Sequence, residues 1–98
     1  MKQPLDIRHN VDRHRFEAVV EGQLARADYR VDEGVLWLFH TEVPRPIGGR
    51  GIAAELVKAA LAHARESGFK VQPACSYVRR YMRQHPETHS LLAPGVRS

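Results

Sequence analysis

The residues with the clearest chemical potential are Gly48-Gly49-Arg50-Gly51, which lead directly into the helical pattern IAAELV. N–H groups in the first turn of a helix have no partner inside the helix, and the helix dipole adds about half a positive charge there. Glycines let these groups approach a phosphate closely because they carry no Cβ. The stretch therefore predicts either an anion site, to which Arg50 adds a charged contact, or a tight turn whose glycines only meet dihedral demands.

The two common nucleotide fingerprints fit this stretch poorly. A Walker A loop carries Lys and then Ser or Thr after its last glycine, where this chain has Ile52-Ala53. A GxGxxG dinucleotide motif would need a glycine at Ala54. The sequence therefore disfavours both of these nucleotide sites.

Cys75, the single cysteine, stands between a short predicted strand and a predicted helix. A helix N-terminus favours the thiolate, so Cys75 is a candidate nucleophile; the alternative is a small buried apolar residue. His40 ends another predicted strand and could serve Cys75 as a base. Neighbouring strand residues point to opposite faces, so His40 faces Cys75 in one register and points away in the other.

Tyr77 and Tyr81 lie four residues apart and share one helix face, where a phenol could donate a proton or both rings could simply pack. A solvated face is the preferred interpretation of the nearby arginines over a role in binding a cofactor phosphate. The histidines show no metal-ligand spacing, so we expect no metal site. The arginines are Arg79, Arg80 and Arg83, and the histidines are His9, His14, His63, His85 and His89.

The elements that must position these residues follow from hydrophobic periodicity. Alternating residues predict strands over 15–20 and 24–31, and the nearly continuous apolar run 35–43 predicts a central strand covered on both faces, with Trp37 in the core. A helix is predicted over 51–67, with an apolar stripe of Ile52, Leu56, Val57, Ala60, Leu61 and Ala64. A strand over 69–74 and a helix over 76–84, N-capped by Ser76, complete the pattern.

Together these elements predict one α/β (α+β) domain over 1–98, with a central, mostly antiparallel sheet, a β-α-β unit and two main helices. We expect residues 1–13 and 88–98 to be loosely ordered. In open sheets with such a unit, ligands bind where a strand's C-terminal end meets the next helix. The glycine-rich stretch lies at that point.

The 98-residue chain carries a net charge of +4, which suits nucleic acid or a phosphorylated small molecule. It has no basic run of five residues and no aromatic stacking row, so a nucleic acid partner is disfavoured. It also lacks a long apolar run and a secretory signal, so no membrane partner is expected. With its single cysteine, the chain is expected to be cytoplasmic.

Three blocks of the chain resemble the small, single-domain GCN5-related N-acetyltransferase-like proteins of the GNAT superfamily. They are His40–Pro44 in WLFHTEVP, Gly49–Ala53 in GRGIAAELVKAALAHARESGFKV, and Cys75–Val78 in PACSYVRRYMRQHPE. The resemblance runs from about Arg15 to Glu87. It implies the minimal acyl-CoA N-acyltransferase fold, with acetyl-CoA or coenzyme A as cofactor.

The resemblance also implies roles for individual residues. The implied cofactor-binding residues are Thr41, Glu42 and Val43 along the pantetheine, Gly48, Gly49, Arg50, Gly51, Ile52 and Ala53 around the pyrophosphate, and Tyr81. The implied catalytic residues are Cys75, His40 and Tyr77. The superfamily usually has Gln or Arg where this chain has Gly48, so the side-chain role of that position is missing here.

The implied function is transfer of an acetyl group from acetyl-CoA to an amine acceptor, a small molecule or a protein, with Cys75 near or at the acetyl-transfer centre. The alternative is a coenzyme A-binding module of the same fold that lacks efficient catalysis and is completed by a partner. The shortness of the chain favours this alternative, because two strands occupy the length in which larger acetyltransferases have acceptor-binding helices.

Overall fold

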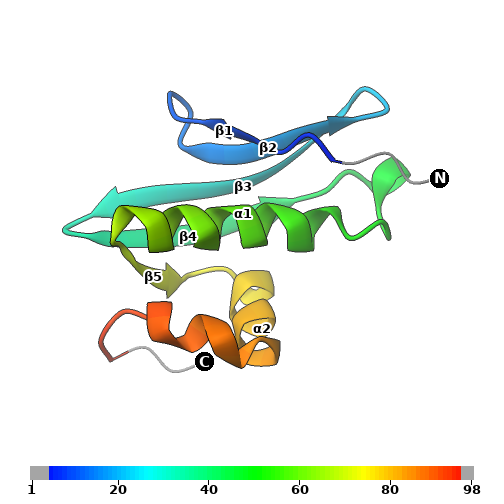
Figure 1. Cartoon of the computed structure of the whole chain (residues 1–98). Coiled ribbons are helices and arrows are strands. Elements are labelled where there is room, and N and C mark those ends of the chain that lie inside the picture. Colours follow the sequence, from blue (N-terminus) through cyan, green and yellow to red (C-terminus); the bar gives the residue numbers. More distant parts are fainter. Residues whose placement is uncertain (1–4, 96–98) are drawn as a thin grey trace.

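The computed structural model describes residues 5–95, which form a five-stranded sheet with one long helix across one face (Figure 1). The strands lie in chain order, antiparallel except for the parallel pair of the fourth and fifth. The elements are β1 (Arg8–Asn10), β2 (Arg15–Val20), β3 (Gln23–Asp32), β4 (Val35–Glu42), η1 (Arg45–Ile47), α1 (Ile52–Ser67), β5 (Lys70–Pro73), α2 (Ser76–Gln84) and η2 (Pro86–Leu91). The predicted fold class, with its β-α-β unit of β4, α1 and β5, is confirmed.

The first half of the sheet is built by two tight hairpins. Glu21-Gly22 joins β2 to β3, and Glu33-Gly34 joins β3 to β4. Both residues of each turn have positive φ, the conformation of the two-residue turns whose twist matches that of paired strands. Glycine at the second turn position makes this conformation inexpensive, so the chain sequence fixes both hairpins locally.

Helix α1 covers what we call the inner face of the sheet. Its buried side chains are the predicted stripe: Ile52, Leu56, Val57, Ala60, Leu61 and Ala64. Alternate strand residues such as Phe16, Ala25 and Leu38 supply the other side of the core. Gly68 ends the helix in the left-handed conformation, with its N–H directed to the carbonyls of the last turn. Within residues 5–95, no helix is long and apolar enough to span a membrane.

The opposite, outer face of the sheet corrects the prediction for 35–43. Trp37 is 41% exposed and Phe39 is 47% exposed, so β4 is not covered on both faces and Trp37 is not a core residue. Strand β4 does lie in the interior of the sheet, between β3 and β5. Only its inner face, with Leu36 and Leu38, lies under α1; the described part of the chain supplies no element that covers the other face.

The segments near the two ends are more ordered than expected. β1 pairs with β2, and His9 stacks on Phe16 with its ring nitrogen hydrogen-bonded to the Tyr29 hydroxyl, which holds residues 8–10 on the sheet. Near the other end η2 is helical, and Leu92 bridges to Val71 beside β5. Residues 8–10 and 86–91 thus belong to regular elements, and Leu92 pairs with Val71. Residues 1–4 and 96–98 lie outside the described part of the chain.

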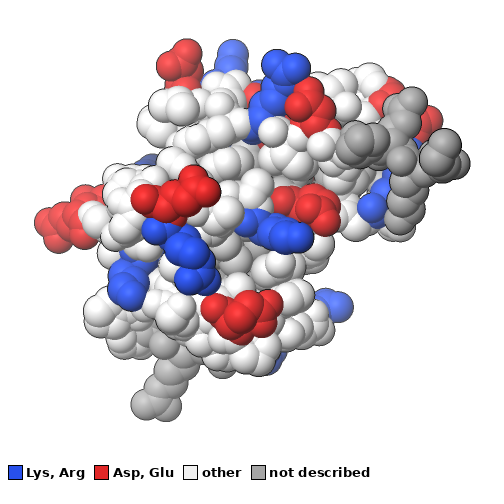
Figure 2. Space-filling view, viewed as in Figure 1, with Lys and Arg blue, Asp and Glu red and all other residues white. Residues whose placement is uncertain are grey.

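Charges of both signs are interspersed on the face of the molecule seen in Figure 2. Blue and red side chains alternate over α1 and the segments around it, and this view shows no extended basic surface. A nucleic acid backbone is bound by clustered Lys and Arg.

Candidate functional site

The site is built where β4 and β5 separate. Their parallel pairing ends at Leu38 and Pro73, with a last bond from the Ala74 N–H to the Leu38 carbonyl. β4 continues to Glu42 paired only with β3, and a register shift on the way leaves Phe39 as an extra residue, a β-bulge. The edge of β4 from Phe39 to Glu42 therefore has no strand partner on its β5 side among the described residues.

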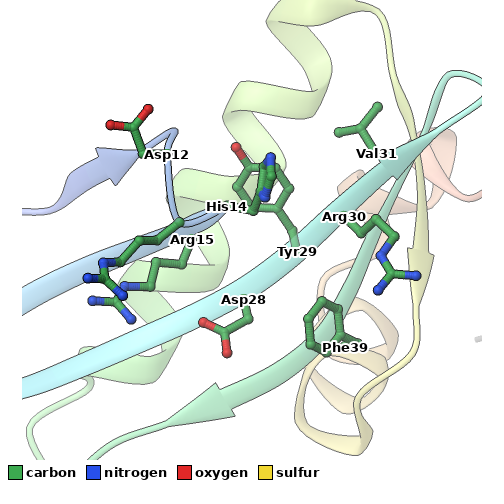
Figure 3. Close-up of a pocket in the computed structure, with 9 residues that line it drawn as sticks. Asp12, His14, Arg15, Asp28, Tyr29, Arg30, Val31 and Phe39 are labelled. Carbon is green, nitrogen blue, oxygen red and sulfur yellow. The ribbon is translucent and has the colours of Figure 1, made fainter.

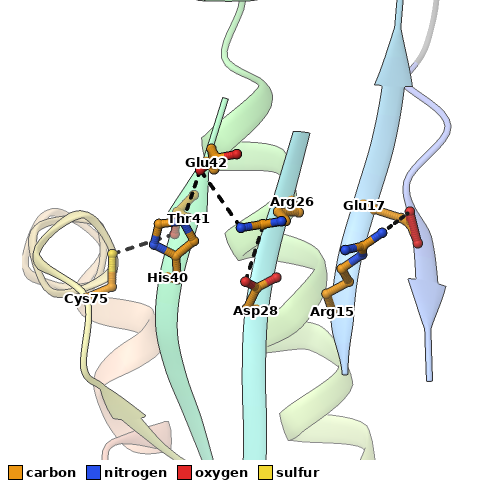
Figure 4. Close-up of polar contacts among 8 residues, drawn as sticks. All are labelled: Arg15, Glu17, Arg26, Asp28, His40, Thr41, Glu42 and Cys75. Atoms are coloured by element: carbon orange, nitrogen blue, oxygen red, sulfur yellow. Dashed lines mark hydrogen bonds and ion pairs between the residues drawn. The ribbon is translucent and has the colours of Figure 1, made fainter. Parts of the chain in front are cut away.

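Thr41 and Cys75 meet across this gap. The Thr41 Oγ1 lies 3.7 Å from the Cys75 Sγ (Figure 4). Cys75 leaves β5 with extended backbone angles and occupies the N-cap position of α2, so Ser76, which we expected to be the N-cap, is the first residue of the helix. Cys75 makes no side-chain capping bond, and its sulfur is free for other chemistry.

The environment of Cys75 favours its thiolate. Partial burial alone would raise the pKa of this thiol. Donors outweigh that effect and lower its pKa below the usual value: the backbone N–H groups of Val78, Tyr77 and Thr41, and the Thr41 hydroxyl. The N–H groups of Tyr77 and Val78 belong to the first turn of α2, where backbone donors favour a thiolate. This lowered pKa increases the thiolate fraction of Cys75 at a given pH.

Alkylation of Cys75 tests this directly. Because the thiolate is the reactive form, the rate of reaction with iodoacetamide should rise with pH around a midpoint below that of the same protein unfolded in urea. Thr41→Val removes the hydroxyl at nearly constant volume and should move the midpoint upward. The measurement is the alkylated fraction by intact mass against time and pH. A folded-state midpoint at or above the unfolded one would contradict the lowered pKa.

Among the described residues His40 makes no hydrogen bond with Cys75, and it belongs to a chain of polar contacts on the outer face. It pairs with Asp28 in register, and its Nε2 lies 3.3 Å from Glu42 Oε1. Arg26 extends the chain to Glu42 Oε1 at 3.9 Å and to Asp28 Oδ2 at 3.3 Å (Figure 4). The contact with Cys75 is made by Thr41, the next residue of the strand.

The two tyrosines remain candidates for proton donation. Burial is the main cause that raises the pKa values of both Tyr77 and Tyr81, and Glu87 and Glu55 raise that of Tyr81 further. Both phenols are therefore protonated at neutral pH. Tyr81 also stacks on His85, with ring centroids 4.0 Å apart, so at least one of the rings has a packing role as well.

The glycine-rich loop presents an open helix N-terminus. Gly51 is the N-cap of α1 in the left-handed conformation, and no side chain caps the helix. Gly49 has the same positive φ, and a Cβ on either glycine would meet no atom within 4 Å. Backbone conformation alone therefore demands these two glycines, while the space beside them is free for a ligand. Gly48 differs: it is extended, and a Cβ there would lie 3.3 Å from the Arg45 carbonyl oxygen.

Two features of the loop are not apparent in the sequence pattern. The first is η1, whose fully buried Ile47 anchors the loop to the core. Pro46 in a first helical turn could have signalled it, since proline is favoured there. The second is an ion pair between Arg50 and Glu21, which belongs to the β2–β3 turn. Val43 is partly buried against the core beside this loop.

Comparisons with known proteins bear on this site. A family model described as GCN5-related N-acetyl-transferase matches residues 15–91. Protein NATD1 from Gallus gallus and from Mus musculus are each 36% identical to the chain over 87 residues, which span 85% of this chain and 78% of theirs. NATD1 from Homo sapiens is 36% identical over 87 residues, 85% of this chain and 76% of its own.

A solved structure shares the fold. The solution NMR structure of a GCN5-like protein from Staphylococcus aureus superimposes with a TM-score of 0.74 at 26% identity, covering 98% of this chain and 94% of that one. The family match spans all the residues of the site, from β4 through the glycine-rich loop to Cys75. The chain therefore belongs to the GCN5-related N-acetyltransferase family.

Proposed function

We propose that this chain binds acetyl-CoA between the end of β4 and the N-terminus of α1 and transfers the acetyl group to an amine. Family and fold support acetyl-CoA-dependent acetyl transfer in general. The observation that carries the proposal for this chain is the gap between β4 and β5, with Cys75 Sγ 3.7 Å from Thr41 Oγ1 inside it. A free strand edge, an uncapped helix and a thiol thus meet in one place.

The residues present fit the two polar parts of coenzyme A. Backbone amides at Gly49, Gly51 and the first turn of α1 suit the pyrophosphate, since they combine unpaired N–H groups with the positive end of the helix dipole. Arg50 would add its charge by leaving its ion pair with Glu21 and pairing with a phosphate. The free edge of β4, from Thr41 to Val43, suits the amide groups of the pantetheine arm, which can pair with a strand as another strand would.

The acetyl group would then lie near Cys75. Transfer to an amine needs a nitrogen with a free lone pair, donors toward the carbonyl oxygen and a proton for the leaving thiolate. The Thr41 N–H and hydroxyl are donors at this point, and Tyr77 or Tyr81 can supply the proton. Cys75 can also accept the acetyl group itself: its sulfur bonds to the carbonyl carbon while the bond to the coenzyme A sulfur breaks. The acceptor amine then takes the acetyl group from Cys75.

A second candidate function is coenzyme A binding without efficient turnover. The arrangement of His40 favours it, because this histidine contacts Glu42 on the outer face and makes no contact with the Cys75 thiol. A general base for the acceptor amine would then have to come from a partner or from the acceptor itself. The two functions share the cofactor site and differ in catalysis.

Titration with coenzyme A and acetyl-CoA tests both functions. We expect calorimetry to give a Kd in about the micromolar range for each compound. Intact mass after an acid quench should show one acetyl group on the protein incubated with acetyl-CoA, and none on Cys75→Ser. Binding with neither adduct nor consumption of acetyl-CoA would favour the binding module. Absence of binding to both compounds would overturn both functions.

A further inference from the structure

The outer face of the sheet carries exposed aromatic side chains together with positive and negative side chains that alternate. The side chains of Trp37 and Phe39 are exposed at its β4 side. Val19, at 67% exposure, lies near the other end on β2. These are large apolar groups on a face that no described element covers. Aromatic residues are enriched in the buried centres of protein–protein interfaces, and large apolar patches usually have a partner.

The charges between these apolar ends alternate in sign. Across the strands one row runs Arg8, Glu17, Arg26, Glu42, and the next runs Arg15, Asp28, His40. Ion pairs within the strands connect Arg15 to Glu17 at 3.6 Å and Arg26 to Asp28 at 3.3 Å. Arg15 Nε, Arg26 Nε and Asp28 Oδ1 are already hidden from solvent. Covering this face would therefore remove little further water from the paired side chains of Arg15 and Glu17, which are 16% and 17% exposed, and more from His40 and Glu42, which are 44% and 54% exposed.

Two hollows flank Phe39 on this face. One of about 730 Å³ runs from the turn after β1 to β4, and Arg13 is among the residues that line it. Arg30 and Phe39 line it as well (Figure 3). A smaller one of about 270 Å³ is bounded by Arg30, Asp32, Trp37 and Phe39. Charges of both signs line them, and Asp12 lies at the rim of the larger one (Figure 3). Among the described residues Arg13, Arg30, Asp12 and Asp32 make no ion pair with one another or with other side chains.

We propose that a second copy of this chain covers the outer face in a two-fold symmetric dimer. An interface between identical surfaces must contain both members of every ion pair, and this face offers cations and anions in alternation. A uniformly acidic or basic partner would leave half of these charges against like charges. The aromatic pair Trp37 and Phe39 would form the apolar centre, and Arg30 and Asp32 would pair between copies.

The size of the face is sufficient. The described chain measures 39 × 29 × 20 Å along its principal axes, and the sheet extends along the longer dimensions (Figure 1). A standard interface needs about 800 Å² from each partner, which a face of these dimensions can supply. Because the proposed coenzyme A site lies at the β4 edge and the α1 N-terminus, the dimer does not depend on the proposed function.

The single tryptophan makes the test direct, because Trp37 is the chain's only tryptophan and lies at the proposed centre. Light scattering after gel filtration and Trp emission are measured on the whole chain over roughly 1–500 μM, a range that brackets weak and standard interfaces. We expect the mass to rise from monomer to dimer and the emission to shift to the blue over the same concentrations, as Trp37 leaves water.

Two variants and one control locate the interface. Phe39→Glu keeps the reporter and should hold the chain monomeric with red-shifted emission; Trp37→Glu should do the same by mass. Val11→Glu places the same substitution on an exposed residue of the turn after β1, which lines neither hollow, and should still dimerise. Circular dichroism verifies that each variant is folded. A monomer at every concentration, or a dimer that survives both face variants, would overturn the proposal.

Discussion

Replacement of Cys75 by alanine should lower the turnover of acetyl-CoA at least about a hundredfold, the low end of what one positioned chemical group contributes. The Kd for coenzyme A should stay unchanged, because the proposed binding groups are backbone amides and the β4 edge. Stability should change little, since Cys75 makes no capping bond to α2. The measurement is release of free coenzyme A, with spermidine and a lysine peptide as amine probes.

Two variants at the same place make this result interpretable. Cys75→Ser replaces the thiol by a hydroxyl of similar size that is not ionised at neutral pH, so it should be nearly as inactive as alanine. Thr41→Val leaves the thiol and removes only its hydroxyl partner at 3.7 Å. Its loss of turnover should therefore be smaller than that of the Cys75 variants, and greatest at low pH. Turnover above half that of the unchanged chain in both Cys75 variants would show that the cysteine has a structural role only.

Replacement of Gly51 by alanine should weaken coenzyme A binding by about tenfold or more, equivalent to roughly 1.4 kcal/mol. A side chain at this N-cap position enters the space in which we place the pyrophosphate. The left-handed backbone also becomes strained, at about 1–2 kcal/mol for a residue with a Cβ. The measurements are calorimetric titration with coenzyme A and urea unfolding of the free protein.

The same helix offers a matched control. Gly68 at the C-cap of α1 has φ 76° and ψ 19°, against 75° and 15° at Gly51, and a Cβ at either residue meets no atom within 4 Å. Gly68→Ala should therefore cost the same unfolding free energy while leaving the Kd for coenzyme A unchanged. Equal losses of affinity in the two variants would mean that strain, and not contact with the cofactor, explains the effect of Gly51→Ala.

Much of the fold could be predicted because its signals are local. The apolar stripe of α1 spans one helical face, and its six residues are the ones buried. The turns at Glu21-Gly22 and Glu33-Gly34 carry their own conformational preference. The bounds of α2, residues 76–84, also agree, because a strand end precedes the segment and His85-Pro86 stops it.

The arrangement of the site needed the tertiary structure. The bulge at Phe39 shifts the register of β4 on β3, and this shift places His40 and Glu42 on the outer face and directs Thr41 toward Cys75. A one-residue change of register moves every side chain to the other face of a strand, so no strand pattern read alone could assign these roles. The ion pair that holds Arg50 to Glu21 likewise joins segments distant in sequence.

By itself the sequence determined the local conformations: two hairpins, a glycine-capped helix and a cysteine before a second helix. These conformations depend on the dihedral preferences and the periodicity of a few adjacent residues, which belong to each segment itself. Tertiary structure decided which residues meet and which faces are covered. The apolar run of β4 looks the same on both faces, yet only the side under α1 is buried and Trp37 is left exposed. Burial depends on what packs against a strand, and the residues of that strand do not encode it.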